Sequence, residues 1–244
     1  MFVNDDKTEF THFYIANKHQ KNDKGELLLY NESWRNSKLL GSKLCSVKDI
    51  QHRICLGWAA FTKFSKVWLQ GPRISMARKL QLYDAQVTSV MVYNCSSWAV
   101  PQAIMNKLDA AHRKHLKCIL NIHWPKKISK EELYKRCNTS PLSTRVDKSR
   151  WTMLGHILRS GENTPAYLSL LFAVNCWFYK LFKGRVGRPY ITLFDIIFND
   201  LKKRNIVLNT PDDLNFIKER FAFNRKLWKK LFVGTYNEAT DTVA

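Results

Sequence analysis

The segment Ser46–Trp68, SVKDIQHRICLGWAAFTKFSKVW, decides the fold class of this chain. Its apolar residues recur at steps of three and four, the spacing of an amphipathic helix with one buried face. Ser46 and Asp49 precede this stripe three residues apart, and we expect them to cap the helix reciprocally. Gly71-Pro72 ends the helix. The stripe consists of Ile50, Ile54, Gly57, Phe61, Phe64 and Trp68.

Two more helices of the same kind follow. Ser75 can cap the first of them, and the second begins after Pro101. Short connections between successive helices favour antiparallel neighbours, so the three helices are predicted to form a compact bundle. Their apolar stripes are Met76, Leu80, Tyr83, Val87, Val90 and Met91, and then Ile104, Leu108, Ala111, His115 and Ile119.

The helical pattern continues beyond Trp124-Pro125. Ser129 and Glu132 form a capping box, and Pro211 with two following acids begins a last helix capped by Thr210. The apolar run 166–179 is too short to span a membrane, which takes about 18 residues, so it is predicted to be a buried helix. The remaining stripes are Val146, Met153, Leu154 and Ile157; Leu193, Ile196, Ile197 and Leu201; and Leu214, Ile217, Phe221, Leu227 and Leu231.

The first forty residues have a different pattern. Two short apolar runs, 9–15 and 26–30, flank the turn sequence 22–25, which predicts a β-hairpin. The sequence therefore predicts a mainly α-helical chain in three parts: a short β-hairpin region over 1–45, a three-helix bundle over 46–125 and a basic helical extension over 126–244.

The charge is strongly basic, with 40 Lys and Arg against 20 Asp and Glu and a net charge of +20. Residues 1–40 hold six basic and six acidic side chains, so the excess lies entirely beyond them. An excess of this size favours a polyanionic partner, and the absence of a long apolar segment favours nucleic acid over membrane. The oligomeric state is left open.

Basic clusters with interleaved aromatic residues indicate where such a partner would bind. Residues 101–160 carry thirteen Lys and Arg against four acids. Arg113, Lys114 and Lys117 lie opposite an apolar stripe, and Trp124 next to Lys126-Lys127 could stack on an unpaired base. The alternative for each cluster is an ordinary solvated helix face. The segment 183–189, with Arg185 and Arg188, is either a phosphate contact or an interhelix linker.

No catalytic or metal-binding constellation stands out. His112, His115 and Cys118 recur every three residues, which is not the spacing of a zinc helix, so we expect no metal and read His115 as a core residue. Six scattered cysteines without a Cys-x-x-Cys pair predict free thiols in a reducing, intracellular compartment, cytoplasmic or nuclear. The tryptophans other than Trp124 are predicted to pack in the core.

The order of several short motifs resembles the non-LTR (LINE-like) retrotransposon reverse transcriptases. Val3–Glu9 is similar to the Asn-x-x-Lys-Thr segment that follows the catalytic strand, and Leu39-Leu40-Gly41-Ser42 to the primer-grip turn, with Leu39 where the family has an aromatic residue. The resemblance continues through the thumb helices and the helical extension behind them. The segments that carry it are Arg53-Ile54, Ala60-Phe61, Val67-Trp68, 79–83, Trp98, 116–122, 154–159, Gly187-Arg188-Pro189 and Arg225-x-x-Trp228.

This resemblance implies a palm remnant over 1–45, a thumb-like bundle over 46–125 and a basic extension over 126–244. The family's catalytic aspartates, which hold Mg²⁺ in the full-length enzyme, would precede Met1, so no polymerase activity and no cofactor are expected of this chain. Lys7 matches a family proton donor that acts only beside triphosphate and metal. The alternatives are that the chain belongs to a longer active RNA-directed DNA polymerase, or is a decayed copy without function.

We expect RNA, an RNA·DNA hybrid or DNA as the partner, held mostly through its phosphates. The side chains predicted to contact it are Arg53, Lys79, Arg113, Lys114, Lys117, Trp124, Lys126, Lys127, Lys130, Arg145, Arg150, Arg185 and Arg188.

Overall fold

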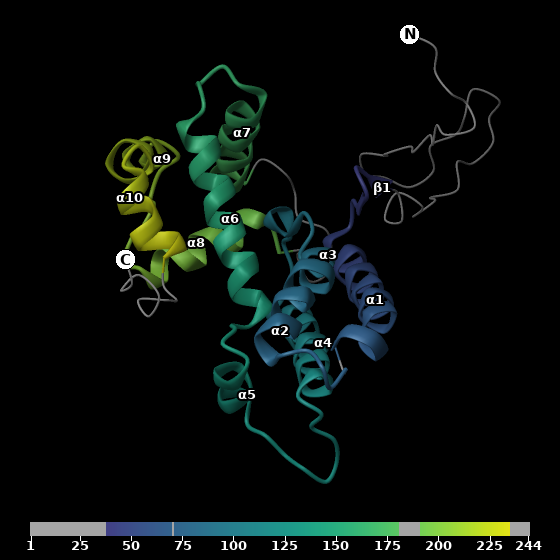
Figure 1. Cartoon of the computed structure of the whole chain (residues 1–244). Helices are drawn as coiled ribbons and strands as arrows, with labels where there is room; N and C mark the ends of the chain where they lie inside the picture. Colours follow the sequence, from purple (N-terminus) through teal and green to yellow (C-terminus); the bar gives the residue numbers. More distant parts are fainter. Residues whose placement is uncertain (1–37, 70, 181–190, 235–244) are drawn as a thin grey trace, which may run out of the picture.

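The computed structural model describes residues 38–69, 71–180 and 191–234, and this part of the chain is mainly α-helical (Figure 1). A two-stranded antiparallel sheet precedes the helices, with β1 (Lys38–Leu39) paired to β2 (Ser42–Lys43). The turn between these strands is the Leu39–Ser42 motif. The hairpin predicted over 9–30, and the predicted site residues Lys7, Arg185 and Arg188, lie outside the described residues.

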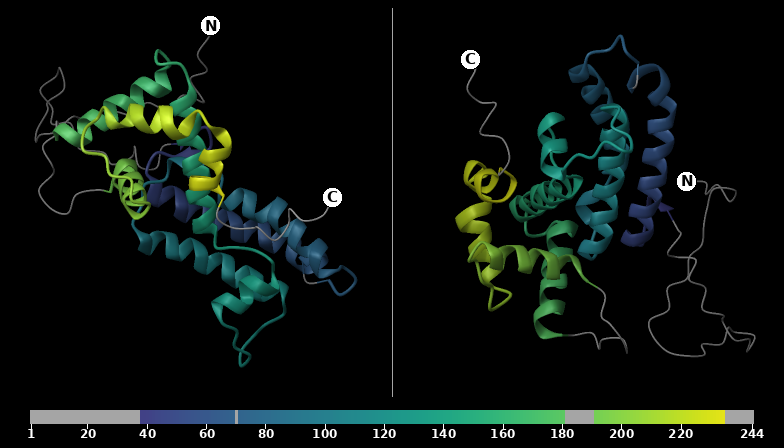
Figure 2. Two further views of the ribbon diagram at one scale, coloured as in Figure 1. Left: turned by 90° about the vertical axis from the view of Figure 1, so that its left-hand side faces the viewer. Right: turned by 90° about the horizontal axis from the view of Figure 1, so that it is seen from below.

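The first group of helices forms the bundle expected from the sequence, with three long helical stretches lying side by side (Figure 2). The first is α1 (Ser46–Phe64), continued by the π-helical turn η3 (Ser65–Leu69). The second runs without a break through α2 (Met76–Tyr83), η4 (Asp84–Thr88) and α3 (Ser89–Met91). The short η5 (Cys95–Ser97) leads to the third, α4 (Gln102–Ile119).

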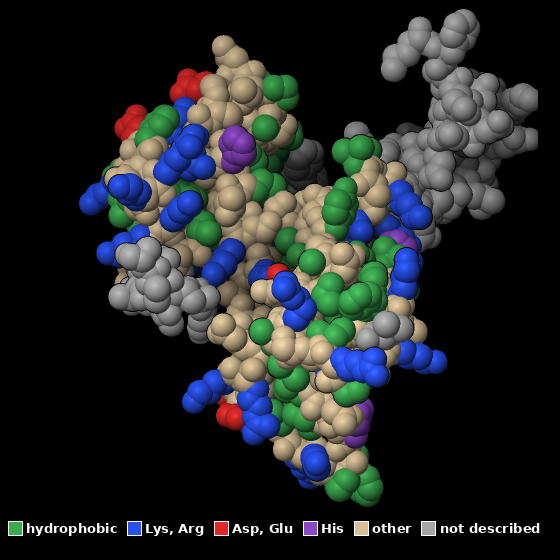
Figure 3. Space-filling model, viewed as in Figure 1, with side chains coloured by type: hydrophobic (Ala, Val, Ile, Leu, Met, Phe, Trp, Pro, Cys, Tyr) green, Lys and Arg blue, Asp and Glu red, His purple; other side chains and the backbone are tan. Residues whose placement is uncertain are grey.

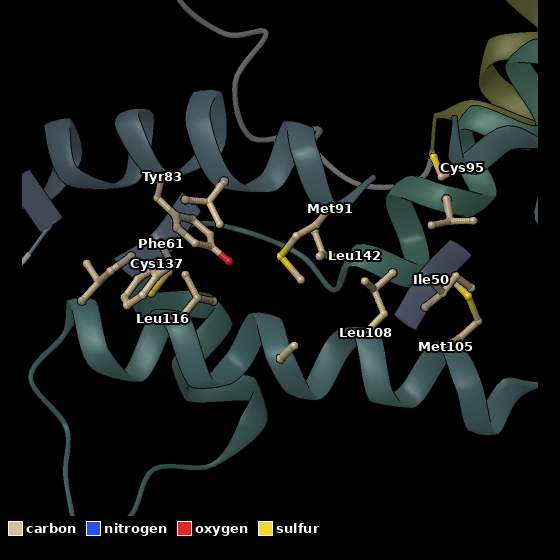
Figure 4. Close-up of a cluster of buried hydrophobic side chains, with 14 of the residues drawn as sticks. Ile50, Phe61, Tyr83, Met91, Cys95, Met105, Leu108, Leu116, Cys137 and Leu142 are labelled. Carbon is tan, nitrogen blue, oxygen red and sulfur yellow. The ribbon is translucent and has the colours of Figure 1, made fainter. Parts of the chain in front are cut away.

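The bundle encloses a hydrophobic core whose centre is shown in Figure 4. Ile50 and Phe61 of α1 face Leu108 and Leu116 of α4, and Met91 fills the space between the helices. Met91 fits because Gly57 has no side chain: a Cβ at that position would lie 2.4 Å from Met91 Cγ. Gly57 therefore allows α1 and α3 to pack closely.

Most of the remaining helices build a second core. They are α5 (Lys130–Arg136), α6 (Leu142–Arg159), α7 (Pro165–Tyr179), α8 (Leu193–Lys203), α9 (Asp213–Ile217), η6 (Lys218–Ala222), α10 (Arg225–Trp228) and η7 (Lys229–Val233). Among them α5 packs with the first core, whereas α7 to η7 surround the second, as their positions around α6 show in Figure 1.

Helix α6 belongs to both cores. Leu142 and Val146 are buried in the first, and Trp151, Leu154 and Leu158 in the second. The predicted boundary near residue 125 falls in the loop before α5, but the change from one core to the other takes place within α6.

Several predicted caps are different in the structure. Asp49 does not cap α1: its carboxylate accepts hydrogen bonds from Lys43 N at 2.9 Å and from Trp98 Nε1 at 2.9 Å, since it is buried beneath the β1–β2 turn. Ser129 does cap α5, accepting a bond from Glu132 N at 3.1 Å. Thr210 does not cap α9, because Asp213 instead accepts the backbone N–H groups of Asn209 and Thr210.

The predicted last helix is also divided in two. It breaks at Phe223-Asn224, and the side chain of Asn224 caps α10 by accepting Leu227 N at 3.0 Å. Trp228 and Phe232 are the buried residues of the second part, rather than Leu227 and Leu231 as the apolar stripe predicted. The break changes which side chains face the core.

The prediction of a buried helix over 166–179 is wrong in part. Only Tyr167, Leu170 and Val174 of α7 are buried, and Phe172 is 61% exposed. Trp68 and Trp177 are also partly exposed, at 49% and 37%, although the sequence predicted that they pack in the core. Trp98, Trp151 and Trp228 are buried as predicted. Within the described residues no helix is both long and apolar enough to cross a membrane.

Candidate nucleic-acid interface

The solvent face of α4 carries a row of lysines. Lys107, Lys114 and Lys117 are seven and three residues apart, so they lie along one side of the helix over roughly 15 Å. The opposite side is buried through Leu108, Leu116 and other residues, which fixes the direction in which the lysines point. Lys107 and Lys114 are exposed, and Lys117 is half-buried. Lys107 extends the predicted face of Arg113, Lys114 and Lys117 by about two turns.

The row leads into the loop between α4 and α5, which projects from the molecule in Figures 1 and 2. Asn121, at φ 53°, ends α4, and the following N–H of Ile122 donates to Lys117 O at 2.9 Å. Beyond it Trp124 is 89% exposed, the most exposed large apolar side chain among the described residues. Lys126 and Lys127 are exposed beside it in the chain.

The loop ends on a helix that is held in place. Ser129 caps α5, and Leu133 and Cys137 bury its inner face against the first core. Lys130, in the first turn, remains exposed. The position of the loop is therefore fixed at both ends, by α4 and by α5.

Few acids neutralise these lysines. Glu132 pairs with Arg136 at 2.7 Å within α5. Among the described residues, none of the lysines at 107, 114, 117, 126, 127 and 130 forms an ion pair within 4.0 Å. Their charges remain available to an external anion.

Two predicted arginines lie at the edge of this surface. The guanidinium of Arg113 donates to the Tyr134 hydroxyl at 3.5 Å, so it is directed toward α5. Burial raises the pKa of Tyr134. Arg145, half-buried on α6, pairs with Asp84 at 2.5 Å between Nη1 and Oδ1. Each arginine has a partner within the protein. Both are therefore weaker candidates for phosphate contacts than the unpaired lysines.

Three residues that were predicted to contact nucleic acid are buried, so the prediction is wrong for them. Arg53 is 6% exposed, and its Nη2 donates to Gly41 O at 2.5 Å and to Ser42 Oγ at 3.1 Å. Arg150 is 2% exposed and donates to Asp147 and to Trp98 O. Lys79 is 8% exposed. The two arginines hold the fold together, and none of the three side chains is free to meet a phosphate.

The histidines of α4 lie beneath the lysine row, on the buried side. Nδ1 of both His112 and His115 faces the Tyr83 hydroxyl, at 2.8 and 3.2 Å. Phe61 stacks on the His115 ring with centroids 4.4 Å apart. Burial lowers the pKa of His112 to about 3 and that of His115 to about 4. No group of three or more metal-ligating side chains is present in the described ranges.

The prediction from the sequence did not include Lys107 or the cations of α10 and η7. Lys107 could have been found from its seven-residue spacing to Lys114. The exposed cations of α10 and η7 include Lys226, Lys229 and Lys230. Lys and Arg side chains far outnumber Asp and Glu side chains on the face shown in Figure 3.

None of the protein-family models matches the chain, and the comparisons with curated proteins and with solved structures likewise found no match.

Proposed function

We propose that this protein binds nucleic acid through the lysine row of α4 and the following loop. The observation that carries the proposal is the exposed Trp124 at the end of a row of unpaired lysines, on a loop fixed at both ends. Lysines along a helix contact successive phosphates, which gives affinity with little sequence information. An exposed indole provides the stacking surface that an unpaired base needs.

The motif order in the sequence supports a more specific proposal. The chain is the thumb-like bundle and extension of a non-LTR reverse transcriptase, and its partner is RNA or an RNA·DNA template-primer inside the cell, in the cytoplasm or nucleus. The helical bundle over α1 to α4 is consistent with a thumb, although many helical proteins have such a bundle. By itself this chain has no polymerase activity, because the aspartates that hold the catalytic Mg²⁺ in that family match no residues in it.

The test is a binding titration with labelled single-stranded RNA, duplex DNA and an RNA·DNA hybrid over a salt series. Lys107→Gln/Lys114→Gln/Lys117→Gln is expected to weaken binding and to flatten its dependence on salt, because each lost phosphate contact lowers the slope by about 0.7 to 0.9. A matched control, Lys38→Gln/Lys48→Gln/Lys180→Gln, removes the same charge from exposed positions outside this surface.

Equal losses in the two triple variants would show that net charge, and not this surface, determines binding. A chain that binds none of the three nucleic acids at low salt would overturn the proposal. A primer-extension assay in the same samples distinguishes a binding module from an active polymerase. Nucleotide incorporation would show that the chain has polymerase activity of its own.

A further inference from the structure

The helix formed by α10 and η7 buries its aromatic residues and exposes a basic side. Trp228 and Phe232 are 2% and 4% exposed, and their rings pack on Trp151 with centroids 5.9 and 4.4 Å away. The Trp228 indole also donates from Nε1 to Trp151 O at 3.0 Å. The two aromatic residues of this helix are therefore used by the second core, whereas Leu231 is 37% exposed.

The side facing solvent carries four cations in six residues. Arg225, Lys226, Lys229 and Lys230 are exposed, and among the described residues none of them pairs with an acid. Residues three and four apart on a helix are neighbours, so this face contains three like-charge pairs that repel one another. The charge of Arg225 also adds to burial in lowering the pKa of Arg159. An anionic partner would relieve this repulsion.

Neighbouring side chains extend the surface. Arg220 of η6 is exposed, and its guanidinium lies 5.2 Å from the Phe216 ring centroid and 5.7 Å from that of Phe221. Phe223, which is 57% exposed, lies between Arg220 and the helix in the chain. Lys218, by contrast, forms an ion pair with Glu162 at 2.8 Å. In Figure 3 basic side chains cluster over the part of the molecule formed by α9 and α10.

The chemistry of this face favours a phosphate polymer over a lipid surface. A helix that binds a membrane surface inserts its apolar side into the lipid. Here Trp228 and Phe232 are buried in the core, and the exposed surface consists mainly of cations, with the partly exposed Phe216, Phe223 and Leu231 among them. Fixed cations with a nearby exposed ring fit a nucleic-acid strand, whose phosphates pair with the cations and whose bases can stack.

We propose that Arg220, Arg225, Lys226, Lys229 and Lys230 form a second nucleic-acid site, separate from the lysine row of α4. This second site depends on the proposed function in one respect only, namely that the ligand is nucleic acid. The two surfaces belong to different cores, so each can be removed without altering the packing of the other.

The experiment uses the full chain with Lys226→Gln/Lys229→Gln/Lys230→Gln, measured on labelled single-stranded RNA and on duplex DNA from low to moderate salt. Loss of three phosphate contacts is expected to weaken binding at least tenfold at low salt and to lower the salt slope by about 2 on single strands. Lys38→Gln/Lys48→Gln/Lys180→Gln is the control of equal charge, and Lys226→Arg/Lys229→Arg/Lys230→Arg, which keeps the charge, should retain binding. The thermal midpoint of each variant verifies folding.

The outcomes separate the two sites. If the α10–η7 variant binds like the control of equal charge while the α4 variant is weakened, the second site is overturned and the proposed function stands. If only the α10–η7 variant is weakened, the second site is supported and the proposed α4 surface fails. Vesicles of phosphatidylserine and phosphatidylcholine provide the competing ligand: loss of vesicle binding together with unchanged nucleic-acid affinity would also overturn the second site.

Discussion

The hydroxyl of Tyr83 lies 2.8 Å from Nδ1 of His112, in the core beneath the lysine row. The same hydroxyl lies 3.2 Å from Nδ1 of His115. A hydroxyl has one proton, so it donates to one histidine and accepts an N–H from the other. Nε2 of both histidines is buried and has no hydrogen-bond partner. Burial lowers the pKa of both rings and holds them neutral, and the charges of Arg145 and Arg113 further lower the pKa of His112.

Stability should fall as the pH decreases below about 6.5. The folded pKa values of His112 and His115, about 3 and about 4, lie below the ordinary value of 6.5, so the unfolded chain binds more protons in acid. Between pH 7 and pH 5 each histidine should cost about 2 kcal/mol of unfolding free energy. Urea titrations at several pH values measure this.

Replacement of one buried histidine tests the origin of that effect. His112→Phe keeps a ring of similar size and should reduce the dependence of stability on pH, whereas the exposed His123→Gln should leave it unchanged. An identical pH dependence in His112→Phe and the original chain would show that other groups cause it.

A methyl group at Gly155 should destabilise the second core. A Cβ there would lie 2.4 Å from Trp228 Nε1, the atom that donates to Trp151 O. Gly155→Ala should therefore displace the indole and lower the free energy of unfolding by about 1 to 3 kcal/mol. Gly161→Ala is the control, because its nearest neighbour would be Thr164 Cγ2 at 3.9 Å. Equal stability of the two variants in urea would contradict the packing described for Trp228.

Removal of the Arg53 guanidinium should affect folding rather than binding. Arg53 pairs with the buried Asp49 at 3.6 Å and holds the β1–β2 turn through Gly41 O. Arg53→Met leaves Asp49 without its cation and should cost about 3 kcal/mol in stability. The nucleic-acid affinity of the folded fraction should stay the same. A variant with normal stability and weakened binding would contradict this prediction and show that Arg53 contacts the nucleic acid.

Substitution of Trp124 should separate stacking from charge. Trp124→Ala should weaken binding to single-stranded RNA by about 1 to 3 kcal/mol if one base stacks on the indole, and should have little effect on duplex DNA. Trp124→Phe should restore part of the loss. Because Trp124 is 89% exposed, the stability of both variants should be unchanged. Equal losses on single strands and duplex would argue against stacking.

The helical class and most of the first bundle could be predicted from the sequence, because the buried residues of α1 and α4 recur at helical spacing. Leu108, Ala111, His115 and Ile119 are buried as the pattern predicted. In the second stretch Tyr83, Val87 and Met91 are buried as the pattern predicted, whereas Met76, the first residue of α2, is 38% exposed.

The candidate site was predictable only in part, because the charge of a side chain does not reveal its burial. Trp124, Lys114 and Lys126 are at the surface, as expected. Arg53 and Arg150 look the same in the sequence, but the fold surrounds them with carbonyl and carboxylate acceptors. The basic face of α10 and η7 was missed because the helix break at Asn224 determines which side of that segment is buried.

The sequence by itself determined that the chain is helical, that its charge excess begins after residue 40 and that Trp124 stands in a basic segment between helices. These are local properties: periodicity, composition and the position of turn residues. The tertiary structure alone decided which cations are free, how α6 joins the two cores and why Gly155 faces Trp228. Those relationships connect residues far apart in the chain, so they depend on how the helices pack and not on the spacing within any one of them.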